Sequence, residues 1–179
     1  MTTVVPLTDA HCDALVRFFA ELPEGDRTFI REDVTDPDVV RGWAAGSPGV
    51  DRWVAVDDDR VLGYVAVLRL PGWSDHVGEV RLVVAPAGRG SGLGGELARH
   101  ATVHALEAGL TKLVVEVVAD QGPALALFTG LGFTGEALLE DHIRDRDGNL
   151  RDLMVLAHHV GDTWAGMDAV GLTEALDTH

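Results

Sequence analysis

A glycine-rich stretch in the middle of the chain is the strongest chemical signal in the sequence. Residues 89–94 read Arg-Gly-Ser-Gly-Leu-Gly, with an apolar run before them and a helical pattern after them. Glycine allows positive φ angles and lets an anion approach the main chain closely. The free N–H groups at a helix start, together with the helix dipole, favour a phosphate or diphosphate. The stretch therefore predicts a site for a phosphate-bearing ligand, with Arg89 as an additional cation.

Two common nucleotide-binding motifs do not fit this stretch. The phosphate loop of nucleoside triphosphatases requires a lysine after its second glycine, and no lysine stands here. A dinucleotide fold places its glycines after the first strand, with an acidic residue about 20 positions later. Here the glycines follow the fourth expected strand, and Glu107 and Glu116 lie on the next helix and on the strand after it. Both nucleotide interpretations fail.

Two glutamates interrupt apolar strand patterns on either side of the glycines. Glu79 lies in the run 78–84 and Glu116 in the run 113–118. An acid in an apolar strand has its pKa raised toward a value useful for proton transfer. Because strand residues alternate between faces, either glutamate could instead face solvent. We expect a general base at Glu79 or, as the second choice, at Glu116.

The elements that must position these residues follow from periodicity and capping signals. Apolar or alternating runs predict strands at 4–5, 53–56, 61–68, 78–84, 113–118, 137–143 and 153–160. Amphipathic patterns and caps predict helices at about 10–20, 36–44, 92–108 and 123–130. We therefore expect one α/β domain over residues 1–160. The tail, 161–179, is expected to be helical.

Composition limits the classes of partner. The chain has 179 residues and a formal net charge of −15, which argues against nucleic acid, since phosphate binding needs a basic surface. The same charge favours cationic substrates through long-range steering, or serves solubility alone. No run approaches the roughly 20 apolar residues of a membrane span. The single cysteine, Cys12, and a start without signal-peptide features indicate a cytoplasmic protein.

Placed after a hairpin and a further long strand, the glycine motif resembles that of the GCN5-related N-acetyltransferase (GNAT) family. The family hallmark, Gln/Arg-x-x-Gly-x-Gly/Ala, is matched by Arg89, Gly92 and Gly94. Val84-Ala85-Pro86 and Leu131-Gly132-Phe133 also match, and the resemblance runs over residues 4–160. It implies the GNAT fold: a single mixed, mostly antiparallel sheet of about seven strands, flanked by about four helices and splayed between strands 4 and 5.

The resemblance implies that acetyl-CoA is the cosubstrate. Main-chain groups of residues 82–84 would pair with the pantetheine arm, amides of residues 90–95 would hold the pyrophosphate, and an N–H near Val83 or Val84 would stabilise the oxyanion. Gln121 stands where many members have Asn. The residues expected to contact the cofactor are Leu82, Val83, Val84, Arg89, Gly90, Ser91, Gly92, Leu93, Gly94, Gly95, Gln121 and Phe128.

Acetyl transfer needs a neutral amine, and deprotonating a lysine-like amine at pH 7 costs about 4.6 kcal/mol. The position of Glu79, ten residues before Arg89, resembles that of the base in actinobacterial protein-lysine acetyltransferases. The position of Glu116 resembles that of the base in ribosomal-protein N-terminal acetyltransferases. The tyrosine that usually protonates the CoA thiolate is replaced by Phe128. Tyr64, the only tyrosine, is expected to be a structural or pocket residue.

The sequence thus predicts an acyl-CoA-dependent N-acyltransferase that moves an acetyl group to a primary amine by direct attack in a ternary complex. The acceptor stays open between a protein lysine, a protein N-terminus and a small basic amine. A non-catalytic acyl-CoA-binding regulatory module is the alternative, because Phe128 and Gln121 depart from the family pattern, and a pure interaction protein is a third. The resemblance to the family also implies that the protein could form a homodimer.

For the histidines near the end of the chain and for Arg31, the sequence supports only weaker predictions. Adjacent strand residues point to opposite faces, so His158 and His159 do not chelate one ion, and we expect no metal. His142 is a candidate for the acceptor pocket. Arg31 is expected to pair with Glu32 or Asp33 across a solvated loop, with a substrate carboxylate as the alternative partner.

Overall fold

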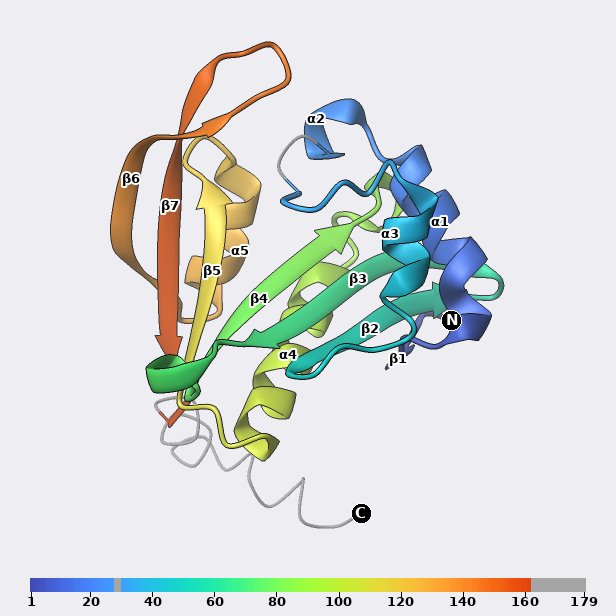
Figure 1. Ribbon diagram of the computed structural model, residues 1–179, viewed down its shortest axis with the longest axis horizontal. Helices are drawn as coiled ribbons and strands as arrows, with labels where there is room; N and C mark the ends of the chain where they lie inside the picture. The colour runs from blue at the N-terminus through green and yellow to red at the C-terminus, as the bar shows by residue number, and fades with distance from the viewer. Residues whose placement is uncertain (28–29, 162–179) are drawn as a thin grey trace.

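The computed structural model describes residues 1–27 and 30–161. Its centre is a seven-stranded sheet in the order β1-β2-β3-β4-β5-β7-β6, shown in Figure 1. The strands are β1 (Thr3–Pro6), β2 (Val50–Asp57), β3 (Arg60–Arg69), β4 (Val77–Val84), β5 (Lys112–Val118), β6 (Thr134–Arg144) and β7 (Leu150–His159). Every neighbouring pair is antiparallel except β4 and β5, which run parallel. The expected GNAT-type sheet is therefore present.

Helices cover both faces of the sheet. They are α1 (Cys12–Glu21), α2 (Glu24–Arg27), α3 (Pro37–Gly42), α4 (Leu93–Glu107) and α5 (Gly122–Gly130), with 3₁₀ turns at Asp9–His11, Gly72–Ser74 and Pro86–Gly88. The buried faces of α4 and α5 pack on one side of the sheet in one apolar cluster. The buried faces of α1 and α3 form a second cluster on the other side. Helices on both faces let the sheet bury residues on both sides, as in other layered α/β domains.

The feature that positions the site is the separation of β4 from β5. The two strands pair only from Val77–Lys112 to Glu79–Val114. Beyond that point β4 continues to pair with β3, and β5 continues to pair with β7. Figure 1 shows the two strands close at one end and diverging toward the other. The expected splay is confirmed, and it begins at Glu79.

Local signals account for where the helices begin and end. The Asp36 carboxylate accepts the N–H of Asp38 at 2.9 Å, and Pro37 occupies the first turn of α3. Gly92 precedes α4 with a φ of 88°, and Gly109 follows it with a φ of 73°. Both angles favour glycine because other residues adopt them only with strain.

One short helix was not predicted. The segment that forms α2 reads Glu-Gly-Asp-Arg, too short and too polar to show an apolar period, and its last residues close onto the carbonyl of Pro23. The strand β6 is longer than predicted at both ends, and β7 begins three residues earlier than predicted. The predicted helix in the tail lies outside the described residues. Among the residues described, no helix is long and apolar enough to cross a membrane.

Candidate active site

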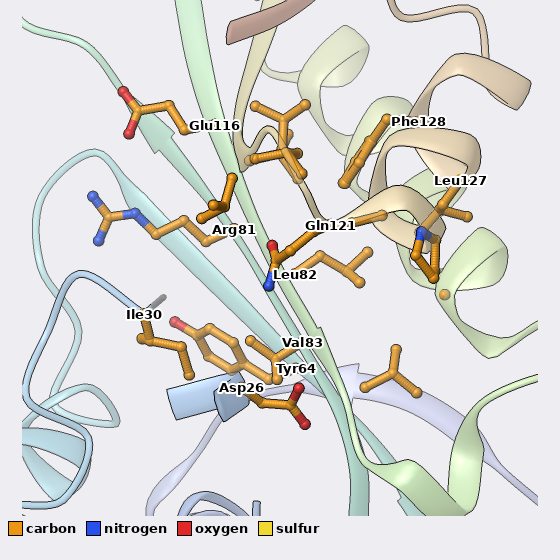
Figure 2. A pocket seen from close by; sticks show the side chains of 18 of the residues that line it. Asp26, Ile30, Tyr64, Arg81, Leu82, Val83, Glu116, Gln121, Leu127 and Phe128 are labelled. Atoms are coloured by element: carbon orange, nitrogen blue, oxygen red, sulfur yellow. The ribbon is translucent and has the colours of Figure 1, made fainter. Parts of the chain in front are cut away.

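A cleft of about 1040 Å³ opens where β4 and β5 diverge. Its lining combines the glycine loop, both splayed strands, α5 and residues from the α1–α3 side. Figure 2 shows side chains from these elements converging on one space, with Gln121 and Leu82 in its middle. The sequence-predicted residues found in the lining are Glu79, Leu82, Val83, Val84, Arg89, Gly90, Gly92, Gly94, Gly95, Glu116, Gln121 and Phe128.

The glycine loop forms one end of the cleft. Gly90 and Gly92 have φ angles of 74° and 88°, and a Cβ added to either would meet no atom within 4 Å, so both face open space. The first main-chain N–H of α4 to find an acceptor is that of Glu96, bonded to Gly92. Within the described part of the chain, the N–H groups of residues 90–95 have no protein acceptor. Free donors at a helix start fit a diphosphate.

Arg89 is held at the same end by two contacts. Its Nε donates to the carbonyl of Val84 at 3.2 Å, and its Nη2 lies 2.5 Å from Oδ2 of Asp26. Asp26 belongs to α2, the helix that the sequence did not predict. The guanidinium is half exposed and lies beside the free amides of the loop. A phosphate that binds the loop would compete with Asp26 for this cation.

The hydrogen-bond pattern of β4 decides which main-chain groups face the gap. The N–H of Ala85 donates to Leu62, and Val77 accepts from Leu70, so odd-numbered residues of β4 bond to β3. Antiparallel pairs alternate in this way along the whole ladder. Main-chain groups of Leu82 and Val84 therefore point toward the gap. The expectation for Val83 needs correction: its main chain belongs to the β3 ladder, and only its side chain lines the cleft.

Gln121 and Phe128 come from the start and the middle of α5. Gln121 occupies the N-cap position, and its amide projects into the cleft in Figure 2. Phe128 is buried and packs edge-on against Phe133, with ring centroids 5.3 Å apart. A phenyl ring has no proton to donate, so this side of the cleft lacks the phenol found in many family members.

Glu79 lies at the other end, at the last paired position of β4 and β5. Its side chain is 12% exposed, and Oε1 accepts from Nε of Arg81 at 2.7 Å. Burial raises the pKa of the Glu79 carboxyl, the positive charge of Arg31 opposes this, and the negative charge of Glu116 adds to it. The geometry therefore gives Glu79 a carboxylate that is more basic than usual.

Arg31 joins the two candidate bases, which differs from the expectation that it pairs with Glu32 or Asp33. Its Nη2 bonds to Oε2 of Glu116, and its Nη1 lies 3.9 Å from Oε2 of Glu79. The expectation considered only neighbours in sequence. The fold brings the loop after α2 over the gap between β4 and β5, where two carboxylates together attract the cation more strongly.

Sequence reasoning also missed Arg81 and Glu32. Arg81 follows Glu79 by two positions on the same strand face, and its Nη1 bonds to Oε1 of Glu32. Burial lowers the pKa of Arg81. The alternation of strand side chains would have placed Arg81 beside Glu79. Nothing in the sequence indicates the contact with Glu32, which comes from a loop far away in the chain.

An aromatic wall closes the cleft on the α1–α3 side. Tyr64 stacks on Trp43 with ring centroids 5.2 Å apart and meets Phe19 edge-on. The Tyr64 hydroxyl accepts from Nε of Arg52 at 3.2 Å, and burial raises its pKa to about 12. Tyr64 therefore serves as a wall rather than as a proton donor. His142, the candidate for the acceptor pocket, also lies in the lining.

His158 and His159 are not part of the cleft lining. Nδ1 of His158 is 3.1 Å from the carbonyl of Gly132, and the His158 ring packs against Phe133. His159 ends β7 and is exposed. Within residues 1–27 and 30–161, no group of three or more His, Cys, Asp or Glu side chains is arranged to hold a metal ion.

A parallel strand pair that splays beside a glycine loop with free amides defines a class of acyl-CoA-dependent acyltransferases. A model of the acetyltransferase (GNAT) family matches residues 15–133. The chain therefore belongs to the GNAT acetyltransferase family.

Individual relatives agree with this assignment. Streptothricin acetyltransferase of Streptomyces lavendulae is 31% identical over 121 residues, covering 61% of this chain and 64% of that protein. The match thus spans just under two thirds of that relative's length. The crystal structure of ribosomal-protein-alanine N-acetyltransferase from Brucella melitensis has a TM-score of 0.78 at 22% identity, covering 88% of this chain and 99% of that one. The structure of yncA from Salmonella typhimurium with its cofactor acetyl-CoA has a TM-score of 0.75 at 21% identity, covering 89% and 94%.

Proposed function

We propose that the protein is an acetyl-CoA-dependent N-acetyltransferase that acetylates a basic primary amine by direct attack in a ternary complex. The observation that carries this proposal is the layout of one continuous cleft. Free main-chain donors and Arg89 stand at one end, and a largely but not fully buried carboxylate, Glu79, stands at the other. This layout suits a long ligand with a diphosphate at one end and a reactive acyl group near a base.

Acetyl-CoA would supply the acetyl group: the amine nitrogen bonds to the carbonyl carbon, the carbon–sulfur bond breaks with its electron pair going to sulfur, and the amine loses a proton. The residues proposed to hold this cosubstrate from the cleft lining are Leu82, Val84, Arg89, Gly90, Gly92, Gly94, Gly95, Gln121 and Phe128. Ser91 and Leu93 are outside the lining and are proposed to act only through their main-chain N–H groups, because the Ser91 hydroxyl donates to Gly88 and the Leu93 side chain lies in the apolar core. Main-chain N–H groups of Leu82 and Val84 are the proposed donors to the developing oxyanion, because they face the gap.

Glu79 is the proposed base, acting directly or through a water molecule. Its burial raises its pKa, which brings the carboxylate closer to the pH at which a general base is most effective. Glu116 stays the second candidate. Its side chain is 33% exposed, against 12% for Glu79, and it is paired with Arg31. The greater burial favours Glu79 for the proton transfer.

Among the described residues, no side chain at the α5 end is placed to give a proton to the departing thiolate, because Phe128 replaces the usual tyrosine. Tyr64 lies on the aromatic wall, and burial raises its pKa to about 12, which makes the phenol a weak acid. A free thiol in water has a pKa of about 8.5, so its thiolate is a tolerable leaving group without an acid. Solvent is the proposed source of the proton.

The proposed acceptor class follows from charge. The chain carries a formal net charge of −15, which steers cations toward it. Three carboxylates, from Glu32, Glu79 and Glu116, face the acceptor side of the cleft. A basic amine would be attracted to this end, whereas an anionic acceptor would be repelled.

The experiment is a thiol-release assay with acetyl-CoA and a panel of primary amines. Glu79→Gln is expected to lower kcat by about 100-fold or more, the usual contribution of a general base. Glu116→Gln is expected to lower kcat less than Glu79→Gln, because Glu116 is not the proposed base. The reverse ranking would transfer the role to Glu116.

CoA binding without thiol release from any amine would contradict the enzyme proposal. That outcome would support the regulatory alternative, for which the replacement of the usual tyrosine by Phe128 is the structural argument. Titration of the protein with CoA alone in a calorimeter is the second measurement. Heat of binding without turnover indicates a binding module, and no heat indicates a protein that does not bind the cofactor.

A further inference from the structure

Arg31 places its guanidinium in the acceptor end of the cleft. One terminal nitrogen bonds to Glu116, and the other lies 3.9 Å from Glu79. The side chain is 57% exposed and comes from a loop rather than from a strand or helix. A cation therefore stands between the two carboxylates nearest to the proposed site of proton transfer.

Arg81 differs from Arg31 in how firmly it is placed. Arg81 lies on β4, is 21% exposed, and bonds to Glu79 and Glu32 from within the sheet. Ion pairs of exposed, long side chains contribute little to stability because water and entropy offset them. Arg31 is thus the cation that an incoming group can displace, and Arg81 is the cation that stays.

The charge balance shows what a displacing group must carry. Within the ion-paired cluster itself, three carboxylates (Glu32, Glu79 and Glu116) contact two guanidiniums (Arg31 and Arg81), which leaves one net negative charge. If Arg31 moves away, the net charge of the cluster becomes two negative charges. A partly buried pair of carboxylates without a cation is unfavourable, so a second positive charge must replace the one that leaves.

We propose that Arg31 occupies the position of a second cationic group on the acceptor, so that the preferred acceptor is a small amine with two positive charges. Its distal ammonium pairs with Glu116 in place of Arg31, while its reacting amine lies at Glu79. This inference rests on the proposed function, because it assumes that this end of the cleft receives the acceptor.

Two other acceptors fit less well. A monoamine with an apolar tail leaves the bond between Arg31 and Glu116 in place and gains no ion pair. An acceptor with a carboxylate could bind Arg31, but both terminal nitrogens of Arg31 already face carboxylates, and the new anion would enter a net negative cluster. The geometry therefore favours an acceptor with two positive charges over both of these.

The test uses three amines of equal length: hexylamine, 1,6-diaminohexane and 6-aminohexanoate. Thiol release from acetyl-CoA should give a kcat/KM for the diamine that is at least about tenfold above that of hexylamine, as one charged hydrogen bond implies. 6-Aminohexanoate should be the poorest substrate. The same order is expected for binding to the CoA complex by calorimetry, which tests the inference independently of turnover.

Three variants identify the residues responsible. Glu116→Gln should reduce the ratio of diamine to hexylamine activity to near one, whatever its effect on overall activity. Arg31→Gln should increase the ratio several-fold, because the competing cation is gone. Arg41→Gln, which neutralises an exposed arginine on α3 paired with Asp13 and Asp38, should leave the ratio unchanged.

Failure of the inference differs from failure of the proposed function. Equal activity and equal binding for the diamine and hexylamine would overturn the inference and leave the acetyltransferase intact. A preference for 6-aminohexanoate that Arg31→Gln abolishes would also overturn it and make Arg31 a carboxylate ligand. The absence of both thiol release and CoA binding would contradict the proposed function itself.

Discussion

Nε of Arg81 donates to Oε1 of Glu79 at 2.7 Å, from a side chain two positions further along the same strand. The pleat of β4 places both side chains on the face where we propose that the acceptor binds, and the same guanidinium also bonds to Glu32. Arg81 therefore fixes the orientation of the proposed base from within the sheet. This is a positioning role, since the reacting amine would contact Glu79.

Replacing Arg81 should affect stability and catalysis together. Arg81→Met removes the cation that Glu79 and Glu32 share and leaves Glu79 only the more distant Arg31. For groups only partly buried we expect a loss of about 1–3 kcal/mol in the free energy of unfolding. Arg81→Lys keeps the charge without the guanidinium fork and should be less destabilising. Urea unfolding measures the stability, and thiol release measures kcat. An Arg81→Met variant with unchanged stability and kcat would rule out this role.

The pH dependence of kcat/KM, which reports the free enzyme, should follow the carboxyl of Glu79. The base works when deprotonated, so kcat/KM rises with pH through the pKa of Glu79, which burial raises above its ordinary value. The positive charge of Arg31 lowers this pKa, so Arg31→Gln should move the acid limb to higher pH. The negative charge of Glu116 raises it, so Glu116→Gln should move the limb to lower pH.

The profile is measured with saturating acetyl-CoA and an acceptor concentration well below KM, between about pH 5 and 9. Glu79→Gln should remove the limb itself rather than shift it. Shifts of the same sign in Arg31→Gln and Glu116→Gln would mean that another group controls the limb.

Asp26 is expected to weaken cofactor binding in the wild-type protein. Its carboxylate lies 2.5 Å from Nη2 of Arg89, beside the free amides of the glycine loop, where it competes with a phosphate. Asp26→Asn removes this competitor and should tighten CoA about 3- to 10-fold, as one weakened ion pair implies. Asp38→Asn on α3 neutralises an exposed aspartate distant from the cleft and should have no effect on CoA binding by calorimetry.

Gly92 and Gly109 provide a matched pair for the glycine loop. Their φ angles are 88° and 73°, and a Cβ at either would meet no atom within 4 Å. Alanine at either position should cost about 1–2 kcal/mol in unfolding free energy, because it must adopt a left-handed conformation. Gly92→Ala should also weaken CoA binding, since its methyl group enters the open space before α4. Gly109→Ala, at the far end of the helix, should bind CoA normally, and equal loss of binding in both variants would contradict the assignment.

Most of the sheet and the cofactor half of the cleft were predictable from the sequence. The long apolar runs of β3, β4 and β5 carry a strong strand pattern, and the glycines at 90–94 mark a loop that opens a helix. These signals are local: each depends on residues within about ten positions of one another. The boundaries of β6 follow from its pairing with β7, and α2 is a four-residue polar helix that buries no side chain, so neither shows in a pattern of apolar residues.

The acceptor half was predictable only in part. Glu79 and Glu116 stand out as acids within apolar strands, but their pairing through Arg31 depends on a loop that lies far from both in sequence. The contact between Asp26 and Arg89 has the same origin. Long-range ion pairs are set by the tertiary fold, and a charged side chain in a loop gives no indication of its partner. Strand pairing also decides that the main-chain groups of Leu82 and Val84 face the gap between β4 and β5, whereas those of Val83 bond to β3.

The most direct test of the central claim compares two fragments of the cofactor by calorimetry. ADP keeps the diphosphate of the cofactor, and adenosine differs from it only in lacking that group. If the amides of residues 90–95 hold the pyrophosphate, ADP should bind at least about 100-fold more tightly than adenosine, because several charged hydrogen bonds are lost together. Equal affinities, or no heat from either compound, would contradict the account.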